Sequence, residues 1–315
     1  MNSVIQGIHH VTAIGGDPQR SIDFYVGLLG LRQVKKTVNF DDPSAYHFYY
    51  GDANGSPGSI VTFFYWPGGD ADGRVGSGQA TALVFSAAPA SLSFWHRRLE
   101  SHGVEVERQE RFGEEVLSFR DPDGIPVEIV AVEFDARSGW DGAGVPQEVA
   151  LRGLHAAELT VVEASLTAAL LTEGMGFRMV RREGNRTRYE VGDGGSGRYA
   201  DVIEGAGERG LGGVGTIHHM AWSVPDVDAE RAKQAEFRSA GLGVSAVMDR
   251  DYFRSIYYRE PGGILFELAT AGPGFAVDED FESLGTQLRL PRQHEALRAE
   301  IERLLPVVEP APVLS

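Results

Sequence analysis

The sequence predicts an α+β protein in which four βαβββ modules form curved mixed sheets in two similar domains. Two observations support this fold class. An order of strand, helix and further strands recurs along the chain, which is the signature of an internal repeat, at 7–66, 80–132, 152–205 and 214–271. In addition, one turn and its following strand occur twice in nearly the same form, as DPDGIPVEIV at 121–130 and as EPGGILFELA at 260–269.

The helix of the first module is expected to begin after Asp17, a residue type that often caps helix N-termini, and Pro18 suits the first turn. Apolar side chains recur at helical spacing between 22 and 29, and Gly30 is expected to end the helix. The segments around it are rich in aromatic and β-branched residues and are broken by Gly, Asn, Pro and Asp. We therefore expect strands at 7–14, 31–40, 45–52 and 59–67.

The other modules repeat this pattern with one helix each. The second has strands at 81–87 and 126–132 and a helix at 90–103. The third has a helix at 164–176 and strands at 153–161, 177–184, 186–192 and 199–205. The fourth has a helix at 228–241 and strands at 215–224, 244–251, 253–260 and 263–270.

Glycine and small polar residues at 136–150 indicate a linker between two halves. The predicted N-terminal domain is therefore 1–135 and the predicted C-terminal domain is 151–272. The remaining residues, 273–315, form a tail with an amphipathic helix after Pro291.

Composition excludes several classes of function. The 315 residues carry a formal net charge of −16, which disfavours nucleic acid and anionic membrane as partners because both require a basic surface. No apolar run approaches the length of about 18 residues that crosses a bilayer, and the N-terminus lacks the pattern of a signal peptide. Without cysteine, a metal must be held by imidazole and carboxylate groups. A cytoplasmic protein is the simplest expectation, and a homo-oligomer is compatible with the sequence.

Four of the nine histidines form two matching pairs in opening strands, His9–His10 in the first module and His218–His219 in the fourth. The second member of each pair occupies an equivalent position. The fourth module also places Glu267 six residues after the turn proline, inside an apolar strand. Burying an unpaired carboxylate is costly, so Glu267 needs a cation. His10, His219 and Glu267 are therefore the predicted ligands of a facial triad with open positions, as in non-haem iron oxygenases.

This grouping requires the first and fourth modules to share one cup-shaped sheet. It also predicts that Phe63, at the position in the first module that corresponds to Glu267, forms an apolar wall where a fourth ligand would otherwise bind. Glu128 follows its turn proline at the same distance as Glu267 and is a rival ligand. If the first and second modules paired instead, His10 and Glu128 would face each other without a complete set of ligands, and we interpret Glu128 as a structural carboxylate.

The other member of each pair, His9 or His218, needs a separate explanation, since adjacent residues of a strand point to opposite faces. Either these histidines support the site by hydrogen bonds or substrate contacts near a bulge, or they pack behind the sheet with a backbone partner. Their spacing does not decide between these two alternatives.

The phrases GIHHVTAI, GTIHHMAWSV and DRDYFRSIYYREPGGILFELAT, with the tail GFAVDEDFESLGTQLRLP, resemble the para-hydroquinone ring-cleaving dioxygenases of the vicinal oxygen chelate superfamily, over essentially the whole chain. The resemblance implies the vicinal oxygen chelate fold, an Fe(II) cofactor with Mn(II) as an alternative, and cleavage of a small aromatic substrate by O2. It implies the metal ligands His10, His219 and Glu267. The supporting or substrate-contacting residues that it implies are His9, Thr12, His218, Arg250 and Tyr257.

Three alternatives stay open from the sequence. Tyr258 replaces Tyr257 at the site if a bulge shifts the strand. A catechol-type extradiol dioxygenase uses the same triad but requires two vicinal hydroxyls at the metal. A non-catalytic protein that binds an aromatic compound would differ by loss of a triad member, and all three members are present here.

Overall fold

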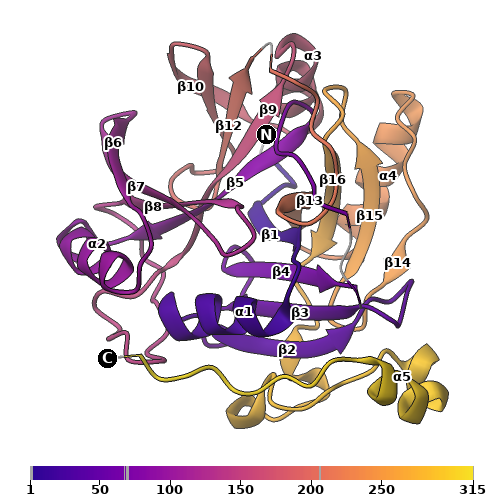
Figure 1. Ribbon diagram of the computed structural model, residues 1–315. Helices are drawn as coiled ribbons and strands as arrows, with labels where there is room; N and C mark the ends of the chain where they lie inside the picture. Colours follow the sequence, from indigo (N-terminus) through magenta and orange to yellow (C-terminus); the bar gives the residue numbers. More distant parts are fainter. Residues whose placement is uncertain (1–2, 67, 69–70, 206, 315) are drawn as a thin grey trace.

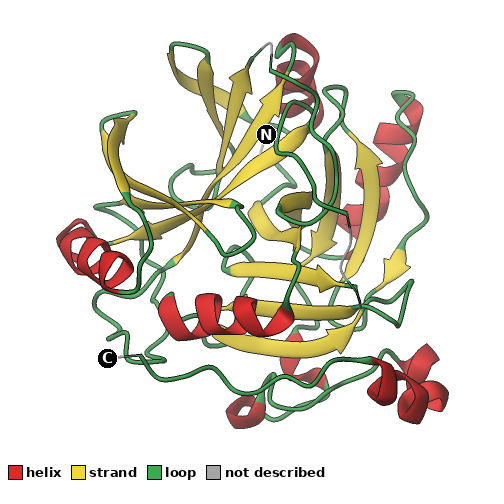
Figure 2. Cartoon of the chain, viewed as in Figure 1, coloured by secondary structure: helices red, strands yellow, loops and turns green. Residues whose placement is uncertain are grey.

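The computed structural model describes residues 3–66, 68, 71–205 and 207–314. These residues form two curved eight-stranded mixed sheets with helices on their outer sides (Figures 1 and 2). The α+β fold class and the βαβββ modules are thereby confirmed. Four residues that belong to predicted elements lie outside the described residues. They are residues 1–2 and 315, at the ends of the predicted N-terminal domain and tail, and residue 67, at the end of a predicted strand.

The first sheet combines the first and fourth modules in the order β14-β15-β16-β13-β1-β4-β3-β2. The strands of the first module are β1 (Gly7–Ile14), β2 (Arg32–Val38), β3 (Tyr46–Gly51) and β4 (Ile60–Tyr65). Those of the fourth are β13 (Thr216–Val224), β14 (Met248–Asp249), β15 (Arg254–Arg259) and β16 (Leu265–Thr270). The two opening strands, β1 and β13, pair antiparallel at the centre of the sheet. The prediction that these two modules share one sheet is confirmed.

The second sheet combines the second and third modules in the order β10-β11-β12-β9-β5-β8-β7-β6. The strands of the second module are β5 (Gln79–Ala87), β6 (Glu107–Arg111), β7 (Glu114–Arg120) and β8 (Pro126–Ala131). Those of the third are β9 (Gly153–Val161), β10 (Arg178–Glu183), β11 (Arg186–Glu190) and β12 (Tyr199–Glu204). Each sheet thus takes four strands from each predicted domain, and the division of the chain at 136–150 stays a prediction.

Each module has one helical segment between its first and second strands. These segments are α1 (Pro18–Ile22) with η1 (Asp23–Leu28), η2 (Pro89–Ser91) with α2 (Leu92–Ser101), α3 (Ser165–Ala169) with η3 (Leu170–Gly174), and α4 (Val227–Ser239). The predicted cap is present, because the Asp17 side chain accepts hydrogen bonds from the backbone N–H groups of Gln19 and Arg20. The tail contains η4 (Phe275–Val277), η5 (Phe281–Ser283), η6 (Arg292–Leu297) and α5 (Arg298–Leu304). The predicted C-terminal helix is therefore present, with its first part wound as a 3₁₀-helix.

The tail packs along the first sheet, beneath β2 and β3 in the view of Figure 1. Its anchor is Lys35 on β2, whose side chain is fully buried. The Lys35 Nζ donates to Asp278 at 2.6 Å, to the carbonyl of Phe275 at 3.1 Å and to Glu279. A buried ammonium needs such partners, because removing it from water without them is costly. This anchor places Phe275 in a small buried cluster with Tyr49 and Phe253, and Phe253 packs against His9 and His10.

Among the described residues, no helix is both long enough and apolar enough to span a bilayer.

Candidate metal centre

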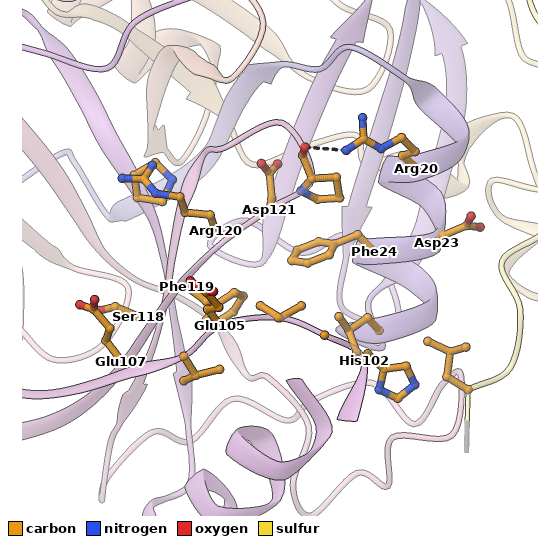
Figure 3. Close-up of a pocket in the computed structure, with 17 residues that line it drawn as sticks. Arg20, Asp23, Phe24, His102, Glu105, Glu107, Ser118, Phe119, Arg120 and Asp121 are labelled. Atoms are coloured by element: carbon orange, nitrogen blue, oxygen red, sulfur yellow. Dashed lines mark hydrogen bonds between the residues drawn. The ribbon is translucent and has the colours of Figure 1, made fainter. Parts of the chain in front are cut away.

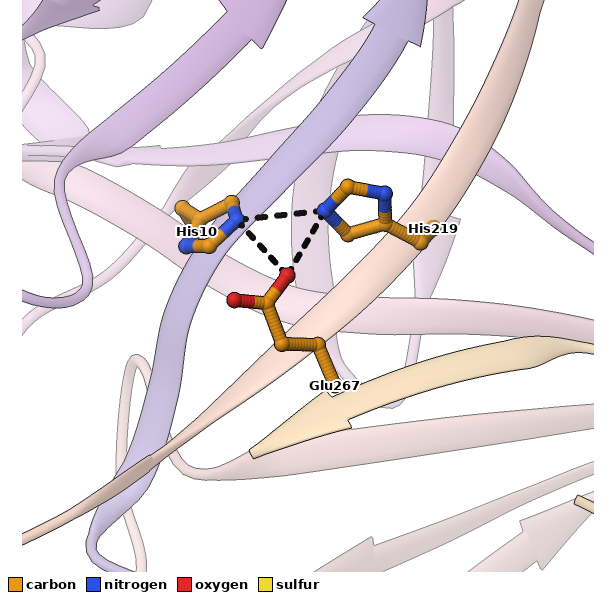
Figure 4. A group of neighbouring side chains, drawn as sticks. All are labelled: His10, His219 and Glu267. Carbon is orange, nitrogen blue, oxygen red and sulfur yellow. Dashed lines mark hydrogen bonds and ion pairs between the residues drawn. The ribbon is translucent and has the colours of Figure 1, made fainter. Parts of the chain in front are cut away.

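Three buried side chains from three neighbouring strands converge in the first sheet, His10 on β1, His219 on β13 and Glu267 on β16 (Figure 4). The Nε2 atoms of His10 and His219 are 3.2 Å apart. The Oε2 atom of Glu267 lies 3.4 Å from His10 Nε2 and 2.9 Å from His219 Nε2. In the described part of the chain, this is the one group of three or more His, Cys, Asp or Glu residues close enough to hold a metal ion together.

The donor atoms fit a divalent metal ion. Two ligands at right angles, each about 2.1 Å from an ion as is typical of imidazole and carboxylate donors, lie about 3 Å apart, close to the three separations observed. Both oxygens of Glu267 are buried; Oε1 has no hydrogen-bond partner among the described residues, and the close polar neighbours of Oε2 are the two imidazole nitrogens. Burial opposes ionisation of Glu267, but the adjacent His10 and His219 hold the pKa of its carboxyl well below its usual value. The result is a buried anion facing two imidazole nitrogens, which suits a bound cation.

His9 orients the ring of His10. Burial, with a smaller contribution from His10, lowers the pKa of His9 to about 3, so its ring is neutral. Its Nε2 lies 3.2 Å from the carbonyl oxygen of Thr270, which can only accept, so Nε2 carries the proton. His9 Nδ1 must therefore accept from His10 Nδ1, 2.8 Å away. This leaves Nε2 as the nitrogen of His10 that can offer a lone pair to a cation at the centre of the triad.

His218 makes the equivalent contact with its neighbour, since the Nδ1 atoms of His218 and His219 are 2.7 Å apart. Unlike His9, His218 is exposed, and its ring packs edge-on against Phe64 at a centroid distance of 5.6 Å. Irregular pairing between β1 and β13 around Ile8–His10 and Thr12–Ala13 lets both members of a pair approach the same region. His9 thus makes both kinds of contact that the two alternatives require, one with its neighbouring histidine and one with a backbone carbonyl. His218 lies at the edge of the site.

A cavity of about 190 Å³ opens beside the triad. This is smaller than the roughly 300–1,000 Å³ of pockets that hold drug-sized ligands, so its size suits one aromatic ring. Its lining residues are His10, Thr12, Asn39, Phe40, Asp41, His47, Tyr49, Phe64, Trp66, His218, His219, Arg250, Phe253 and Tyr257.

The fourth module contributes Arg250 and Tyr257, two residues that the resemblance implies, to the lining of the cavity. The ring of Tyr257 meets that of His219 edge-on, with centroids 5.7 Å apart. The guanidinium of Arg250 lies over the Tyr257 ring and donates to Asp41 Oδ2 at 3.1 Å. Tyr258 instead points into the core and packs on Phe237. Of the two adjacent tyrosines, the first therefore faces the cavity.

Thr12 also lines the cavity, but the predicted role of Phe63 is wrong. Phe63 is fully buried on the other face of β4, where its ring packs on Tyr25 at 4.7 Å. On β13 and β16, Ala221 pairs with Glu267, and the corresponding pair on β1 and β4 is Thr12 with Thr62. The residue equivalent to Glu267 is thus Thr62. A shift of one residue exchanges the two faces of a strand, which is why the sequence alignment selected the wrong side chain.

Several lining residues were not predicted from the sequence. His47 and Tyr49 are on β3, and the segment 39–41 connects β2 to β3 at the cavity mouth. The sequence contains a partial signal for His47 and Tyr49. They lie two residues apart in one strand, where alternate side chains point to the same face of the sheet. The segment 39–41 carries no sequence signal. Its position depends on the tail, since Gln293 and His294 both donate to the Phe40 carbonyl, at 2.6 and 2.9 Å.

The equivalent place in the second sheet is filled by ion pairs. Arg111 binds Glu128 through two hydrogen bonds of 2.6 and 2.7 Å. Arg186 donates to Glu158 at 2.6 Å, and Arg188 donates to both carboxylate oxygens of Asp201. A guanidinium is thus the cation beside Glu128, as expected for a structural carboxylate.

A larger hollow, about 950 Å³, lies between α1–η1 and the segments around β6 and β7 (Figure 3). It shares no lining residue with the cavity beside the triad. Its most buried acid, Asp121, accepts hydrogen bonds from the Tyr25 hydroxyl and from the backbone N–H groups of Asp123 and Ile125. These bonds occupy the Asp121 carboxylate, and none of the three predicted metal ligands lines this hollow.

Comparison with known proteins identifies relatives that match this chain over nearly its whole length. A protein called "Putative ring-cleaving dioxygenase MhqO", from Bacillus subtilis (strain 168), is 45% identical over 302 residues, which cover 95% of this chain and 96% of that protein. Chlorohydroquinone/hydroquinone 1,2-dioxygenase from Sphingobium indicum is 37% identical over 311 residues, which cover 96% of each chain. A crystal structure of a Bacillus subtilis protein called a "putative dioxygenase" superposes with a TM-score of 0.95 at 43% identity, covering 99% of this chain and 100% of that one.

A more distant structure, glyoxalase I from Zea mays, superposes with a TM-score of 0.62 at 15% identity over 84% of this chain and 92% of that chain, which shows a shared fold. The family model described as the Glyoxalase/Bleomycin resistance protein/Dioxygenase superfamily matches residues 7–129 and 153–268, which include four complete opening strands. The chain therefore belongs to the glyoxalase/bleomycin resistance protein/dioxygenase superfamily.

Proposed function

We propose that this protein is a non-haem Fe(II) dioxygenase that opens the ring of a hydroquinone, with or without ring substituents, next to a hydroxylated carbon and uses O2 as the oxidant. The observation that carries the proposal is the convergence of His10, His219 and Glu267 at 2.9–3.4 Å beside a cavity that suits one aromatic ring. The whole-length similarity to a hydroquinone 1,2-dioxygenase supports the substrate class.

The triad would hold Fe(II), with Mn(II) as the alternative, and leave coordination positions open toward the cavity. Bound there, the metal supplies Lewis acidity toward a phenolic oxygen and a path for electrons from the ring to O2. His9 keeps the His10 lone pair directed at the metal position through the Nδ1 contact of 2.8 Å. His218 makes the equivalent Nδ1 contact of 2.7 Å with His219 from the cavity side.

The remaining residues act on the substrate. Burial, with a smaller effect of Glu267, raises the pKa of Tyr257, so its hydroxyl keeps its proton and donates to an oxygen in the cavity. Arg250 supplies a fixed positive charge for a hydroxyl that does not reach the metal, or for negative charge that develops there. Phe64 and Phe253 provide apolar walls for the ring. A para-diol suits this arrangement, because only one of its hydroxyls can reach the metal and the second is free to bind Arg250.

The test is anaerobic reconstitution with Fe(II) or Mn(II), followed by O2 uptake with hydroquinone, methylhydroquinone and catechol in parallel. We expect one metal per chain and O2 uptake with the two hydroquinones. Glu267→Gln should lose both metal and O2 uptake, whereas Glu128→Gln, at the equivalent place of the second sheet, should retain its metal content. Turnover of catechol without turnover of hydroquinone would favour the catechol-type reaction. Stoichiometric metal in a His219→Ala protein would refute the triad.

A further inference from the structure

A chain of hydrogen bonds in the cavity wall leads away from the triad through four buried side chains, Tyr49, His47, Thr62 and Thr12. The Tyr49 hydroxyl lies 3.1 Å from His47 Nδ1, and His47 Nε2 lies 2.9 Å from Thr62 Oγ1. Thr62 in turn donates to Thr12 Oγ1 at 2.8 Å. Thr62 occupies the position that corresponds to Glu267, so the first module has a hydroxyl where the fourth has a metal ligand.

The direction of this chain follows from counting hydrogens. Thr62 has one hydroxyl hydrogen and donates it to Thr12, so it can only accept from His47. His47 must then carry its proton on Nε2. Burial, with smaller contributions from His10 and His219, lowers the pKa of His47 well below its usual value, so the ring is neutral and its Nδ1 is an acceptor. The remaining bond therefore runs from the Tyr49 hydroxyl to Nδ1, and burial keeps that hydroxyl protonated by raising its pKa.

One hydrogen remains unassigned, that of the Thr12 hydroxyl. Thr12 Oγ1 accepts from Thr62 and makes no other hydrogen bond within the described residues. Thr12 lines the cavity, and on the sheet it lies directly opposite His219. Its hydroxyl hydrogen is therefore free to bind an acceptor oxygen that enters the cavity next to the triad.

We propose that His47, acting through Thr62, fixes the Thr12 hydroxyl as a hydrogen-bond donor for a phenolic oxygen of the substrate. His47 is thus a positioning residue. Without its Nε2–H, Thr62 and Thr12 can reverse their bond, and Thr12 would then face the cavity as an acceptor. Only the identity of the bound oxygen rests on the proposed function, because the direction of the chain is fixed by the protein itself.

The first experiment measures the tautomer of His47 by long-range proton–nitrogen NMR on the full-length, metal-free chain labelled at its nine histidines. The signals of His47 are identified by their absence in His47→Phe. We expect a neutral ring protonated at Nε2. Protonation at Nδ1 alone, or at both nitrogens, would overturn the proposal without reference to any ligand.

The second experiment measures the dissociation constant of hydroquinone for the Fe(II)-loaded protein by calorimetry without O2. His47→Phe, Thr62→Val and Thr12→Val should each raise it about five- to tenfold, the usual value of one hydrogen bond, whereas Thr12→Ser should not. The matched control is Thr160→Val, which breaks a similar bond of 2.9 Å to Thr81 in the second sheet and should leave binding unchanged.

A double-mutant cycle identifies the route of the effect. If His47 acts through Thr12, adding His47→Phe to Thr12→Val should raise the dissociation constant no further. An additive effect, or a His47→Phe protein that binds as tightly as the Thr160→Val control, would overturn the proposal. If His47→Phe does not fold, Thr62→Val tests the same link. Absence of hydroquinone binding to the unaltered protein would instead refute the proposed function, and the NMR result would still decide the direction of the chain.

Discussion

Glu230, near the start of α4, offers a test of the electrostatics behind the first sheet. Its side chain is fully buried, and neither carboxylate oxygen has a hydrogen-bond partner among the described residues. Burial, followed by the negative charge of Glu267, raises the pKa of Glu230 from 4.5 to about 7. Above that pH the native protein therefore contains a buried, unpaired anion, and we expect Glu230→Gln to stabilise it.

The sign and size of the expected stabilisation by Glu230→Gln follow from proton linkage. The unfolded chain loses the Glu230 proton near pH 4.5 and the native chain near pH 7, so stability falls as pH rises between these values and then stays level. At about 1.4 kcal/mol per pKa unit, the native state is destabilised by about 3 kcal/mol above pH 7. Glutamine carries no charge and so removes this destabilisation, but it leaves an unpaired buried amide, which costs about 1 kcal/mol. We expect a net stabilisation of about 2 kcal/mol at high pH.

Urea unfolding of the metal-free chain at about pH 5 and about pH 8 measures this difference. The stabilisation should appear at the higher pH and vanish or reverse at the lower one. Glu236→Gln is the control, because Glu236 lies on the same helix but is exposed and contacts Lys233 at 2.8 Å. Equal effects of Glu230→Gln at both pH values would show that Glu230 is not a buried anion. Metal binding at Glu267 should reduce the effect, since a cation there offsets the charge that raises the Glu230 pKa.

Three further predictions concern other parts of the molecule. His9→Phe should weaken metal affinity about 10- to 100-fold, because the His10 ring loses the partner that orients it, and competition with a chelator measures this. The control is His155→Phe, which replaces a buried histidine of the second sheet. Equal metal affinities of the two variants would exclude this role of His9. Arg111→Met should destabilise the protein by about 3–5 kcal/mol in urea unfolding, because it leaves the buried Glu128 carboxylate without its cation. Its metal content should be unchanged. Loss of metal would show that the second sheet supports the site. Asp17→Ala should cost about 1 kcal/mol through loss of the α1 cap, and an unchanged unfolding midpoint would mean that the cap contributes nothing.

The sequence was sufficient for the modules and for the triad, because both depend on local patterns that repeat. A histidine pair in an opening strand and a glutamate at a fixed distance from a turn proline can each be aligned between modules. The pairing of the first and fourth modules also followed, since only that pairing assembles three ligands. By contrast, the misassigned Phe63 depended on the parallel register of β1 and β4, which sets Thr12 against Thr62 and which no local pattern fixes.

The cavity was harder to predict because its walls come from segments that are far apart in the sequence. The connection at 39–41 is held at the cavity by Arg250, which binds Asp41, and by the tail residues Gln293 and His294, which bind the Phe40 carbonyl. The tail itself is held by the buried ion pairs of Lys35 with Asp278 and Glu279. Long-range contacts of this kind have no periodicity, and a lysine in an aromatic-rich strand reads as an exposed residue until its partners are known.

The two sheets show what distinguishes the proposed metal ligand from a structural acid on the same scaffold. Glu267 and Glu128 occupy equivalent positions, each paired with the opening strand of its own module, at Ala221 and Val84 respectively. Both are buried, so each requires a cation. Two residues before these partners, the first sheet has His219 and the second has Ala82, whose methyl group cannot hold a metal. In the second sheet the Arg111 guanidinium binds the carboxylate directly. The glutamate alone therefore predicts a cation, and the residue on the adjacent strand decides whether that cation is a metal ion or an arginine.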